Sequence, residues 1–285
     1  MNKAATLALR TPSTAIAKFF RKPKSLLILI FVLLALLAGL GNGLALVAPG
    51  LAAAMIAAAA TDVLLIRYMD DEWCFPDGAL LTGMIVGMIL SPREPWHVAA
   101  VTSVVGIVSK VVLRTHSANI FNPAALALVA TFYVFSPGQN WWGAMPDMPP
   151  YALVVLIATG IFITDRVNKL PAVLAFLGAY FLLFTLTAFF SDPARVAEIY
   201  RTPDLQAVLF FGFFMVTDPP TSPPRARDQL VFGVITAVAS YAVFELVGAA
   251  YFLLAGLLLA NGWEAWRRVR AKTTRHLKAR AGAYG

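Results

Sequence analysis

The residues best suited to chemistry lie in one proline-rich segment, residues 213–223. An apolar run ends there at Thr217 and Asp218, and two further hydroxyl side chains follow at Thr221 and Ser222. A carboxylate and hydroxyls at the broken end of an apolar helix can form a ligand site within a membrane. The same residues can instead be structural, with Thr217 capping the break and Asp218 capping the next helix. The spacing alone leaves both interpretations open.

A second polar segment stands at the start of another apolar run. Asn119, Asn122 and Pro123 directly precede residues 124–135, which are almost all apolar. The asparagine side chains can satisfy backbone groups of an opened helix or point their amides at a ligand. If the chain contains an internal repeat, the sequence leaves two candidates for the repeat partner of residues 213–223: this segment, or the break at Ser91 and Pro92.

Two carboxylates lie inside apolar stretches, Asp62 and Glu245. An ionisable group within a membrane span is costly and commonly marks an ion pathway. We therefore predict that both are candidates for proton or cation passage.

Other cofactor chemistries lack the residues that they need. The single cysteine, Cys74, excludes an intrachain disulfide and a cysteine-rich metal cluster within one chain. The three histidines, His97, His116 and His276, are too scattered to supply paired haem ligands. We predict neither a set of catalytic residues nor a metal site.

Tryptophan pairs occur in a loop at Trp141 and Trp142, and near the last apolar run at Trp263 and Trp266. Tryptophan is enriched where a membrane meets water, so the simplest prediction is that all four are interfacial anchors. The first pair can alternatively stack on a flavin or on a partner's cofactor.

The elements that position these residues must cross a membrane. The chain has 285 residues, of which 59% are hydrophobic and 13% charged, and its mean hydropathy is +0.74. Soluble domains carry about 25% charged residues, so much of this surface must face hydrocarbon. The net charge of +8 is confined to the ends and short loops, which is typical of membrane topology rather than of nucleic-acid binding.

Apolar length predicts ten membrane-spanning helices, with about 20 residues needed to cross a 30 Å core. The third and eighth runs are too short to cross alone, and each ends at a proline. The predicted runs are 25–40, 45–66, 79–90, 96–113, 119–135, 151–164, 170–190, 205–217, 230–246 and a tenth that ends at residue 259.

The charges of the loops test this count. With the N-terminus inside, 20 of the 23 lysines and arginines fall in inner segments. This bias predicts a bacterial-type inner membrane protein with both termini in the cytoplasm.

The two short runs occupy corresponding places and cross in opposite directions, which is typical of inverted repeats. We predict an all-α membrane protein with two inverted five-helix repeats and broken third and eighth helices. The predicted parts are a basic N-terminal segment, 1–24, one membrane domain, 25–262, with repeats at 25–136 and 151–262, and a basic tail, 263–285, that contacts anionic lipids.

Several motifs resemble a known family of membrane proteins, which supplies the D-type component of the Rnf electron-transport complex and the B-type component of the sodium-translocating NADH:quinone oxidoreductase. The motifs are Thr82-Gly83-Met84, Leu90-Ser91-Pro92, Asn119-Ile120-Phe121-Asn122-Pro123-Ala124, Phe213-Phe214-Met215-Val216-Thr217-Asp218-Pro219 and Thr221-Ser222-Pro223. The resemblance implies ten helices in two inverted repeats, a fold similar to urea and ammonium channels, and flavin-linked electron transfer. It implies cofactor-binding roles for Thr82, Asn119, Asn122, Pro123, Thr217, Asp218, Thr221 and Ser222.

One departure from the family concerns its covalent flavin. Family members attach FMN to a threonine of a Ser-Gly-Ala-Thr type sequence in the loop after the Asn-Pro span. Here that loop, residues 138–147, contains no threonine. We therefore expect riboflavin or FMN to be held non-covalently.

Three functions follow as hypotheses. The first is a non-catalytic or electron-carrying subunit of an oxidoreductase complex, working with redox partner subunits or a soluble flavin or iron–sulfur reductase. The second is a channel or transporter for a small solute or ion. The third is a membrane anchor for a reductase. Nucleic acid is not expected as a partner, and self-association is left open.

Overall fold

The computed structural model describes residues 22–70, 75–115, 118–190, 197, 200–201 and 204–281. Within these residues the chain forms ten α-helices and one 3₁₀ turn and no strand, as the prediction of an all-helical protein requires. The helices are α2 Pro23–Asn42, α3 Leu44–Asp70, α4 Asp77–Ile89, α5 Trp96–Val112, α6 Pro123–Phe135, α7 Tyr151–Arg166, α8 Leu170–Phe190, α10 Asp204–Phe214, α11 Ala226–Val247 and α12 Phe252–Ala281, and η1 is Trp142–Ala144. Residues 1–21 of the predicted N-terminal segment, Cys74 and His116 lie outside the described residues.

Four of these helices, α2, α3, α8 and α11, are long and apolar enough to cross a bilayer. Helices α4, α5, α6 and α10 are apolar but have 10–17 residues, fewer than a full crossing requires. Large apolar side chains also point outward, such as Leu36, Leu64 and Leu182. Because such a surface is stable only in lipid, the chain is a multi-pass membrane protein.

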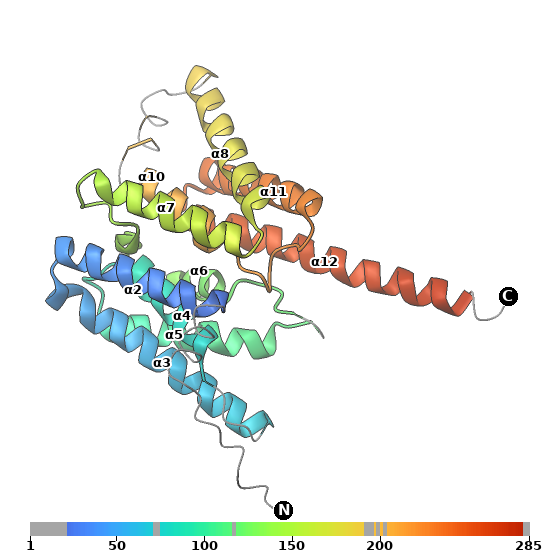
Figure 1. Ribbon diagram of the computed structural model, residues 1–285, viewed down its shortest axis with the longest axis horizontal. Helices are drawn as coiled ribbons and strands as arrows, with labels where there is room; N and C mark the ends of the chain where they lie inside the picture. The colour runs from blue at the N-terminus through green and yellow to red at the C-terminus, as the bar shows by residue number, and fades with distance from the viewer. Residues whose placement is uncertain are drawn as a thin grey trace, which may run out of the picture.

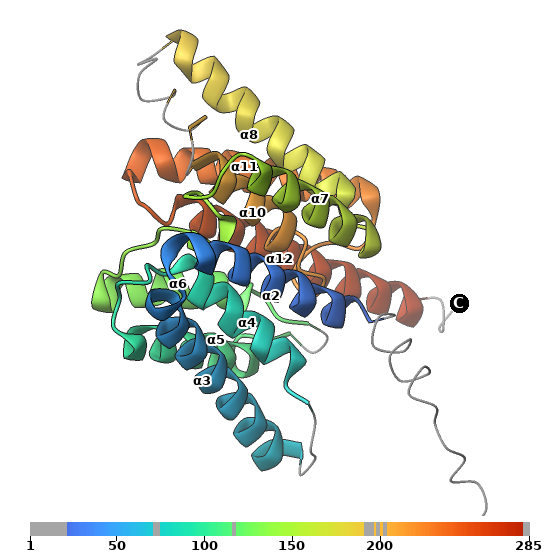
Figure 2. The same cartoon turned by 60° about the vertical axis from the view of Figure 1, so that its left-hand side comes forward.

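The helices pack in two groups (Figures 1 and 2). In the first group α3 packs against α4 and α5, and α5 packs against α6. In the second, α8 packs against α11, α11 against α12, and α7 against α10. Contacts of α2 with α7, and of α6 with α12, join the two groups. The short helices α4 and α10 therefore lie inside the bundle, covered by the longer ones.

Glycine allows some of these helices to approach closely. A Cβ atom at Gly83 of α4 would lie 2.7 Å from the carbonyl oxygen of Ala54 on α3. A Cβ atom at Gly233 of α11 would likewise collide with the Ala172 carbonyl oxygen on α8. In lipid the hydrophobic effect does not drive helices together, so their association depends on close packing of this kind.

The loop between α6 and α7 folds back onto the end of α4. The indole Nε1 of Trp142 donates a hydrogen bond to the Gly87 carbonyl oxygen at 2.7 Å, and the Trp141 amide donates to Ile89 at 3.1 Å. These donors satisfy carbonyl groups that the end of a helix leaves unpaired. Trp141 is 7% exposed and Trp142 1%, so the prediction that this pair anchors at the membrane interface is wrong.

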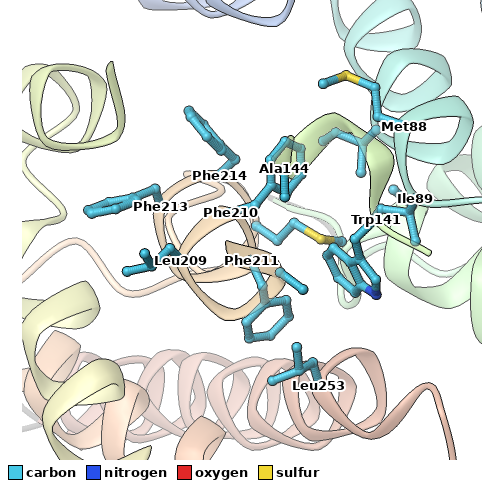
Figure 3. Close-up of a cluster of buried hydrophobic side chains, with 14 of the residues drawn as sticks. Met88, Ile89, Trp141, Ala144, Leu209, Phe210, Phe211, Phe213, Phe214 and Leu253 are labelled. Atoms are coloured by element: carbon cyan, nitrogen blue, oxygen red, sulfur yellow. The ribbon is translucent and has the colours of Figure 1, made fainter. Parts of the chain in front are cut away.

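Trp141 also joins a buried aromatic cluster (Figure 3). The Trp141 ring lies 6.2 Å from the Phe210 ring, which lies 5.0 Å from the Phe214 ring, measured between centroids. Phe211 and Phe213 of α10 are buried in the same region. Helix α10 is thus held by aromatic side chains on several of its faces.

Candidate functional site

A cavity of about 610 Å³ lies between the two groups of helices. Its walls come from the starts of α2, α4 and α6, the ends of α5, α7 and α10, and the turn after α10. Helix α4 meets the cavity with its N-terminal part, at Gly78, Leu81 and Thr82, whereas α10 meets it with its C-terminal end, at Phe213 and Phe214. The two short helices therefore enter the cavity with opposite polarity.

Six of the eight predicted cofactor-binding residues line this cavity: Thr82, Asn119, Asn122, Pro123, Thr217 and Asp218. The two others, Thr221 and Ser222, lie directly behind Asp218 in the same turn. Residues 119–123 and 213–223 therefore meet at one cavity. The break at Ser91 instead joins the loop after α6, where its amide donates to the Gly138 carbonyl oxygen at 2.8 Å.

The turn after α10 is stabilised by its own side chains. Thr221 Oγ1 donates to Asp218 Oδ2 at 2.8 Å, and Ser222 Oγ donates to the Asp218 carbonyl oxygen at 2.7 Å. Thr217 Oγ1 donates to the Phe213 carbonyl oxygen at 2.6 Å, which closes the broken helix end. The alternative that Asp218 caps the next helix is wrong, because the residue at the N-cap of α11 is Arg225.

Burial raises the pKa of the Asp218 carboxyl above its ordinary value, and this is the largest effect on that group. The hydrogen bond from Thr221 and the positive charges of Lys110 and Lys169 lower its pKa and oppose the effect of burial. Asp218 is therefore a carboxyl whose charge is sensitive to what occupies the cavity.

Asn261 connects the two polar segments, although it belongs to none of the sequence motifs. Its Oδ1 accepts a hydrogen bond from the Asn122 amide at 2.9 Å, and its Nδ2 donates to the Thr221 carbonyl oxygen at 3.3 Å. Asn122 in turn caps α6, because its Oδ1 accepts from the Ala125 amide at 3.1 Å. An asparagine directly after the last apolar run was the available signal, because a buried amide needs partners.

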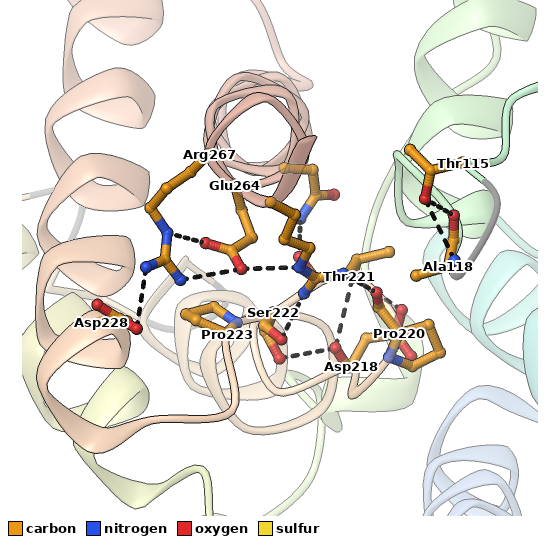
Figure 4. A network of polar contacts seen from close by, with 12 residues as sticks. Thr115, Ala118, Asp218, Pro220, Thr221, Ser222, Pro223, Asp228, Glu264 and Arg267 are labelled. Carbon is orange, nitrogen blue, oxygen red and sulfur yellow. Dashed lines mark hydrogen bonds and ion pairs between the residues drawn. The ribbon is translucent and has the colours of Figure 1, made fainter. Parts of the chain in front are cut away.

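Cationic side chains hold the outer surface of the same turn (Figure 4). Arg268 donates to the carbonyl oxygens of Pro220 and Ser222, both at 2.8 Å. Glu264, which is 1% exposed, accepts from Arg268 Nε and Arg267 Nε, both at 2.8 Å. Helix α12 therefore fixes the turn that carries Asp218.

Lys169 supports the turn from the loop between α7 and α8. Its Nζ donates to the Pro223 carbonyl oxygen at 2.7 Å and to that of Ser222 at 3.3 Å. The pKa of Lys169 is lowered to about 8, mainly by burial and also by the positive charge of the neighbouring Arg268. The carboxyl groups of Asp218 and Glu264 favour the charged form and oppose this decrease.

Two lysines lie at the cavity. Lys24 forms an ion pair with Asp77 at 2.9 Å, and Lys110 donates to the Gly78 carbonyl oxygen at 3.0 Å. A second hollow of about 500 Å³ adjoins the cavity and shares Lys110, Asn119 and Pro220 with it.

The two predicted ion-pathway residues lie in different places. Asp62 lines the second hollow, next to the central cavity. Glu245 lies near the far end of α11 and is not among the residues that line the cavity. The structure therefore brings only Asp62 close to the polar site.

The sequence profile of the NQR2, RnfD, RnfE family matches residues 21–149 and 149–263. The D-type component of the ion-translocating oxidoreductase complex of Haemophilus influenzae is 30% identical over 108 residues, which are 37% of this chain and 27% of that protein. The aligned part thus spans little more than a quarter of that relative's length. The resemblance seen in the sequence is confirmed, and because the profile covers both groups of helices, this chain belongs to the NQR2, RnfD, RnfE family.

Proposed function

We propose that this protein is the membrane subunit of a transmembrane electron-transfer system and holds riboflavin or FMN non-covalently in the central cavity. One observation carries the proposal: the motif residues of two broken elements, about a hundred positions apart in the chain, line a single cavity. The relative from Haemophilus influenzae is named as a subunit of an ion-translocating oxidoreductase complex. By analogy, we propose that this chain works with redox partner subunits or a soluble reductase.

The chemistry of the cavity suits a flavin. Its volume of about 610 Å³ lies within the range of about 300–1,000 Å³ that is usual for cofactor pockets. Leu27, Leu81 and Phe214 offer apolar walls for a ring system, and Thr82 and Asp218 offer polar groups for its edge. When bound, a flavin supplies one- and two-electron transfer.

We infer non-covalent binding of the flavin from the sequence and packing of the loop between α6 and α7. This loop has no threonine at residues 138–147, and its tryptophans are buried against the end of α4. The loop is therefore used for packing and offers no hydroxyl for a phosphoester at those positions.

The packing between the cavity and this loop argues for electron transfer over solute transport. Phe210, Phe214 and Trp141 are buried there and their rings are in contact. A solute would have to displace these side chains to pass, whereas an electron needs no open path. Transport by the related channel fold, and a role as a reductase anchor, remain the second and third hypotheses.

We also propose that the two groups of helices are inverted repeats. Equivalent pairs pack in each group: α3 with α5 and α8 with α11, α5 with α6 and α11 with α12, and α2 with α4 and α7 with α10. The opposite polarity of α4 and α10 at the cavity supports this relation. From the bias of lysine and arginine we also propose that both termini lie in the cytoplasm of a bacterial-type cell.

The proposal is tested by purifying the whole chain in mild detergent and recording its absorbance before and after acid precipitation. We expect a yellow protein whose flavin is released into the supernatant by acid. The Asp218→Asn variant should retain less flavin, because the amide changes both charge and hydrogen bonding at the cavity wall.

The matched control is Asp147→Asn in the loop between α6 and α7, which should retain as much flavin as the unaltered protein. A colourless preparation of the folded protein, after growth with added riboflavin, would contradict flavin binding. Flux of urea, ammonium or cations above that of empty liposomes would favour the transport hypothesis instead.

A further inference from the structure

The second hollow, which adjoins the central cavity, contains a carboxyl group that the proposed function leaves unused. This hollow of about 500 Å³ is walled by one face of α3, from Asp62 to Met69, and by Lys110 and Arg114 at the end of α5. Asp62 is half-buried, whereas Met69 and Arg114 are exposed. An exposed arginine is costly in lipid, so the hollow reaches the surface where water is available.

Three residues stand between this hollow and the central cavity. Lys110, Asn119 and Pro220 line both spaces. Lys110 Nζ donates to the Gly78 carbonyl oxygen at 3.0 Å and keeps further donors for water, while the Asn119 side chain can both donate and accept. A hollow of this volume with polar walls accommodates water. Hydrogen-bonded water can therefore connect Asp62 with the cavity past these two side chains.

The surroundings of Asp62 leave its carboxyl group able to take up and release a proton. Among the charged groups, Lys110 acts on it most strongly, followed by Asp77 and Lys24. The last two pair with each other at 2.9 Å, so their effects on Asp62 largely cancel. Within the part of the chain that the structure describes, no hydrogen bond or ion pair holds this carboxyl group.

A third hollow, of about 510 Å³, also meets the cavity at Pro220, but its acids are committed to arginines (Figure 4). Asp228 pairs with Arg267 at 3.0 Å. Glu264 pairs with Arg267 and Arg268, both at 2.8 Å. A carboxylate held by arginine keeps its charge and is a poor proton acceptor. The second hollow is therefore the better route for protons.

A flavin in the central cavity needs such a route. A flavin ring that accepts two electrons also takes up two protons, and a redox partner supplies the electrons but not the protons. Phe210 and Phe214 are buried beside the cavity, with their rings in contact. Aromatic hydrocarbon side chains offer no group that carries a proton, so protons must enter from a polar side.

We propose that the second hollow is the route by which protons reach the flavin, and that Asp62 is the residue that takes them from water. This inference rests on the proposed function, because the redox cofactor is what consumes the protons. Each proton passes from water to the Asp62 carboxylate and then along water past Lys110 and Asn119 to the reduced ring. The carboxylate is restored after each transfer, so Asp62 acts as a relay and does not touch the flavin.

The test uses the whole chain in mild detergent with its flavin bound. A laser flash on dissolved deazaflavin reduces the bound flavin, and the absorbance change that accompanies protonation of the reduced ring gives the rate of proton delivery. We expect Asp62→Asn to lower this rate about tenfold or more, because a positioned proton-transfer group commonly contributes more than that. Its flavin content should stay unchanged, because Asp62 is not among the residues that line the cavity.

Two further measurements separate proton transfer from a structural effect. Asp62→Glu keeps a carboxyl group and should retain most of the rate. Added formate should restore the rate of Asp62→Asn, because the hollow has room for a small acid, whereas a structural defect would not respond to formate. The matched control is Asp228→Asn, which removes a carboxylate from the wall of the third hollow and should leave the rate unchanged.

Three results would overturn the proposal: an unchanged rate in a yellow Asp62→Asn protein, an equal loss in Asp228→Asn, or a loss that formate does not relieve. A colourless preparation of the unaltered protein would refute the flavin, and this route with it. A yellow protein whose rate does not depend on Asp62 refutes the route alone and leaves the proposed function standing.

Discussion

At the scale of single residues, the polar site depends on side chains that bridge distant parts of the chain. Asn261 satisfies the amide of Asn122 and the carbonyl group of Thr221 at once. Buried polar groups that lose their partner cost more than the hydrogen bond itself contributed. The bridging residues should therefore be more sensitive to substitution than polar residues that bond within one helix.

We expect Asn261→Ala to destabilise the protein by about 1–3 kcal/mol, because it leaves a buried backbone amide without an acceptor. The measurement is the midpoint of thermal unfolding in detergent, followed by tryptophan fluorescence. Asn42→Ala is the control, since the Asn42 side chain donates to Ala38 of its own helix at 3.1 Å. Equal shifts for the two variants would refute the bridging role of Asn261.

Lys169 should give the stability a distinct dependence on pH. Its pKa is about 8 in the folded protein and has an ordinary value of 10.5. Between these values the unfolded chain binds a proton that the folded chain does not, so the free energy of unfolding should rise with pH from about 8 to 10.5. Below pH 8 the group is charged in both states and contributes no slope.

The variant Lys169→Arg retains hydrogen-bond donors but does not titrate in this range. We expect it to remove the part of the rise between pH 8 and 10.5 that Lys169 causes, as measured by detergent-solubilised unfolding at fixed ionic strength. An unchanged slope in this variant would assign the dependence to other groups.

At the scale of elements, the short helices depend on close backbone contact with their neighbours. Gly83→Ala would place a methyl group 2.7 Å from the Ala54 carbonyl oxygen, and overpacking of this kind costs about 1–3 kcal/mol. Gly178→Ala on α8 meets no atom within 4 Å and should be neutral or stabilising by up to about 1 kcal/mol. Thermal unfolding of the two variants measures the difference, and a stabilising Gly83→Ala would contradict the packing.

The elements themselves were largely predictable from the sequence. Apolar length and loop charges predicted the first nine of the ten described helices to within a few residues, because the hydropathy of a membrane chain reports on the solvent around each segment. The tenth run was expected to end at residue 259, but α12 continues to Ala281, because lysine and arginine end an apolar run without ending a helix. The breaks at residues 119–123 and 213–223 were also predicted, because proline and asparagine interrupt apolar runs visibly.

The remaining features could not be read from the sequence because they depend on tertiary contacts. The burial of Trp142 against Gly87 requires the loop after α6 to fold across the bundle, and composition alone indicated an interfacial residue. Glu264 falls within the predicted basic tail, 263–285, but two arginines within about one helical turn allow it to be buried. Thr82 became a candidate site residue only through the family resemblance, whereas residue type and position alone left Asp218 open between a ligand site and a structural role.

At the scale of the whole molecule, access to the cavity should be one-sided. Lys24 at the start of α2 and Lys110 near the end of α5 line the cavity, while the aromatic side chains of α10 and the loop after α6 are buried beyond it. In a Cys74→Ser background, a cysteine at Asn119 should react with a membrane-impermeant maleimide only from the side of the C-terminal tail. A cysteine at Tyr151, which is exposed at the other end of α7, should react only from the opposite side.

This labelling in right-side-out and inverted vesicles also measures the predicted orientation. Reaction of both cysteines from the same side would contradict the ten-span topology. Reaction of the Asn119 cysteine from both sides would show a continuous aqueous path and favour transport.

The hydrogen bond from Trp142 to Gly87 also affects how the protein is made. Its two partners are 55 residues apart, and α4, which contains Gly87, is synthesised before the loop that contains Trp142. The carbonyl groups at its end therefore lack these donors while the next two helices enter the membrane. We therefore expect the end of α4 to gain its last hydrogen bonds only after the loop that follows α6 has been synthesised.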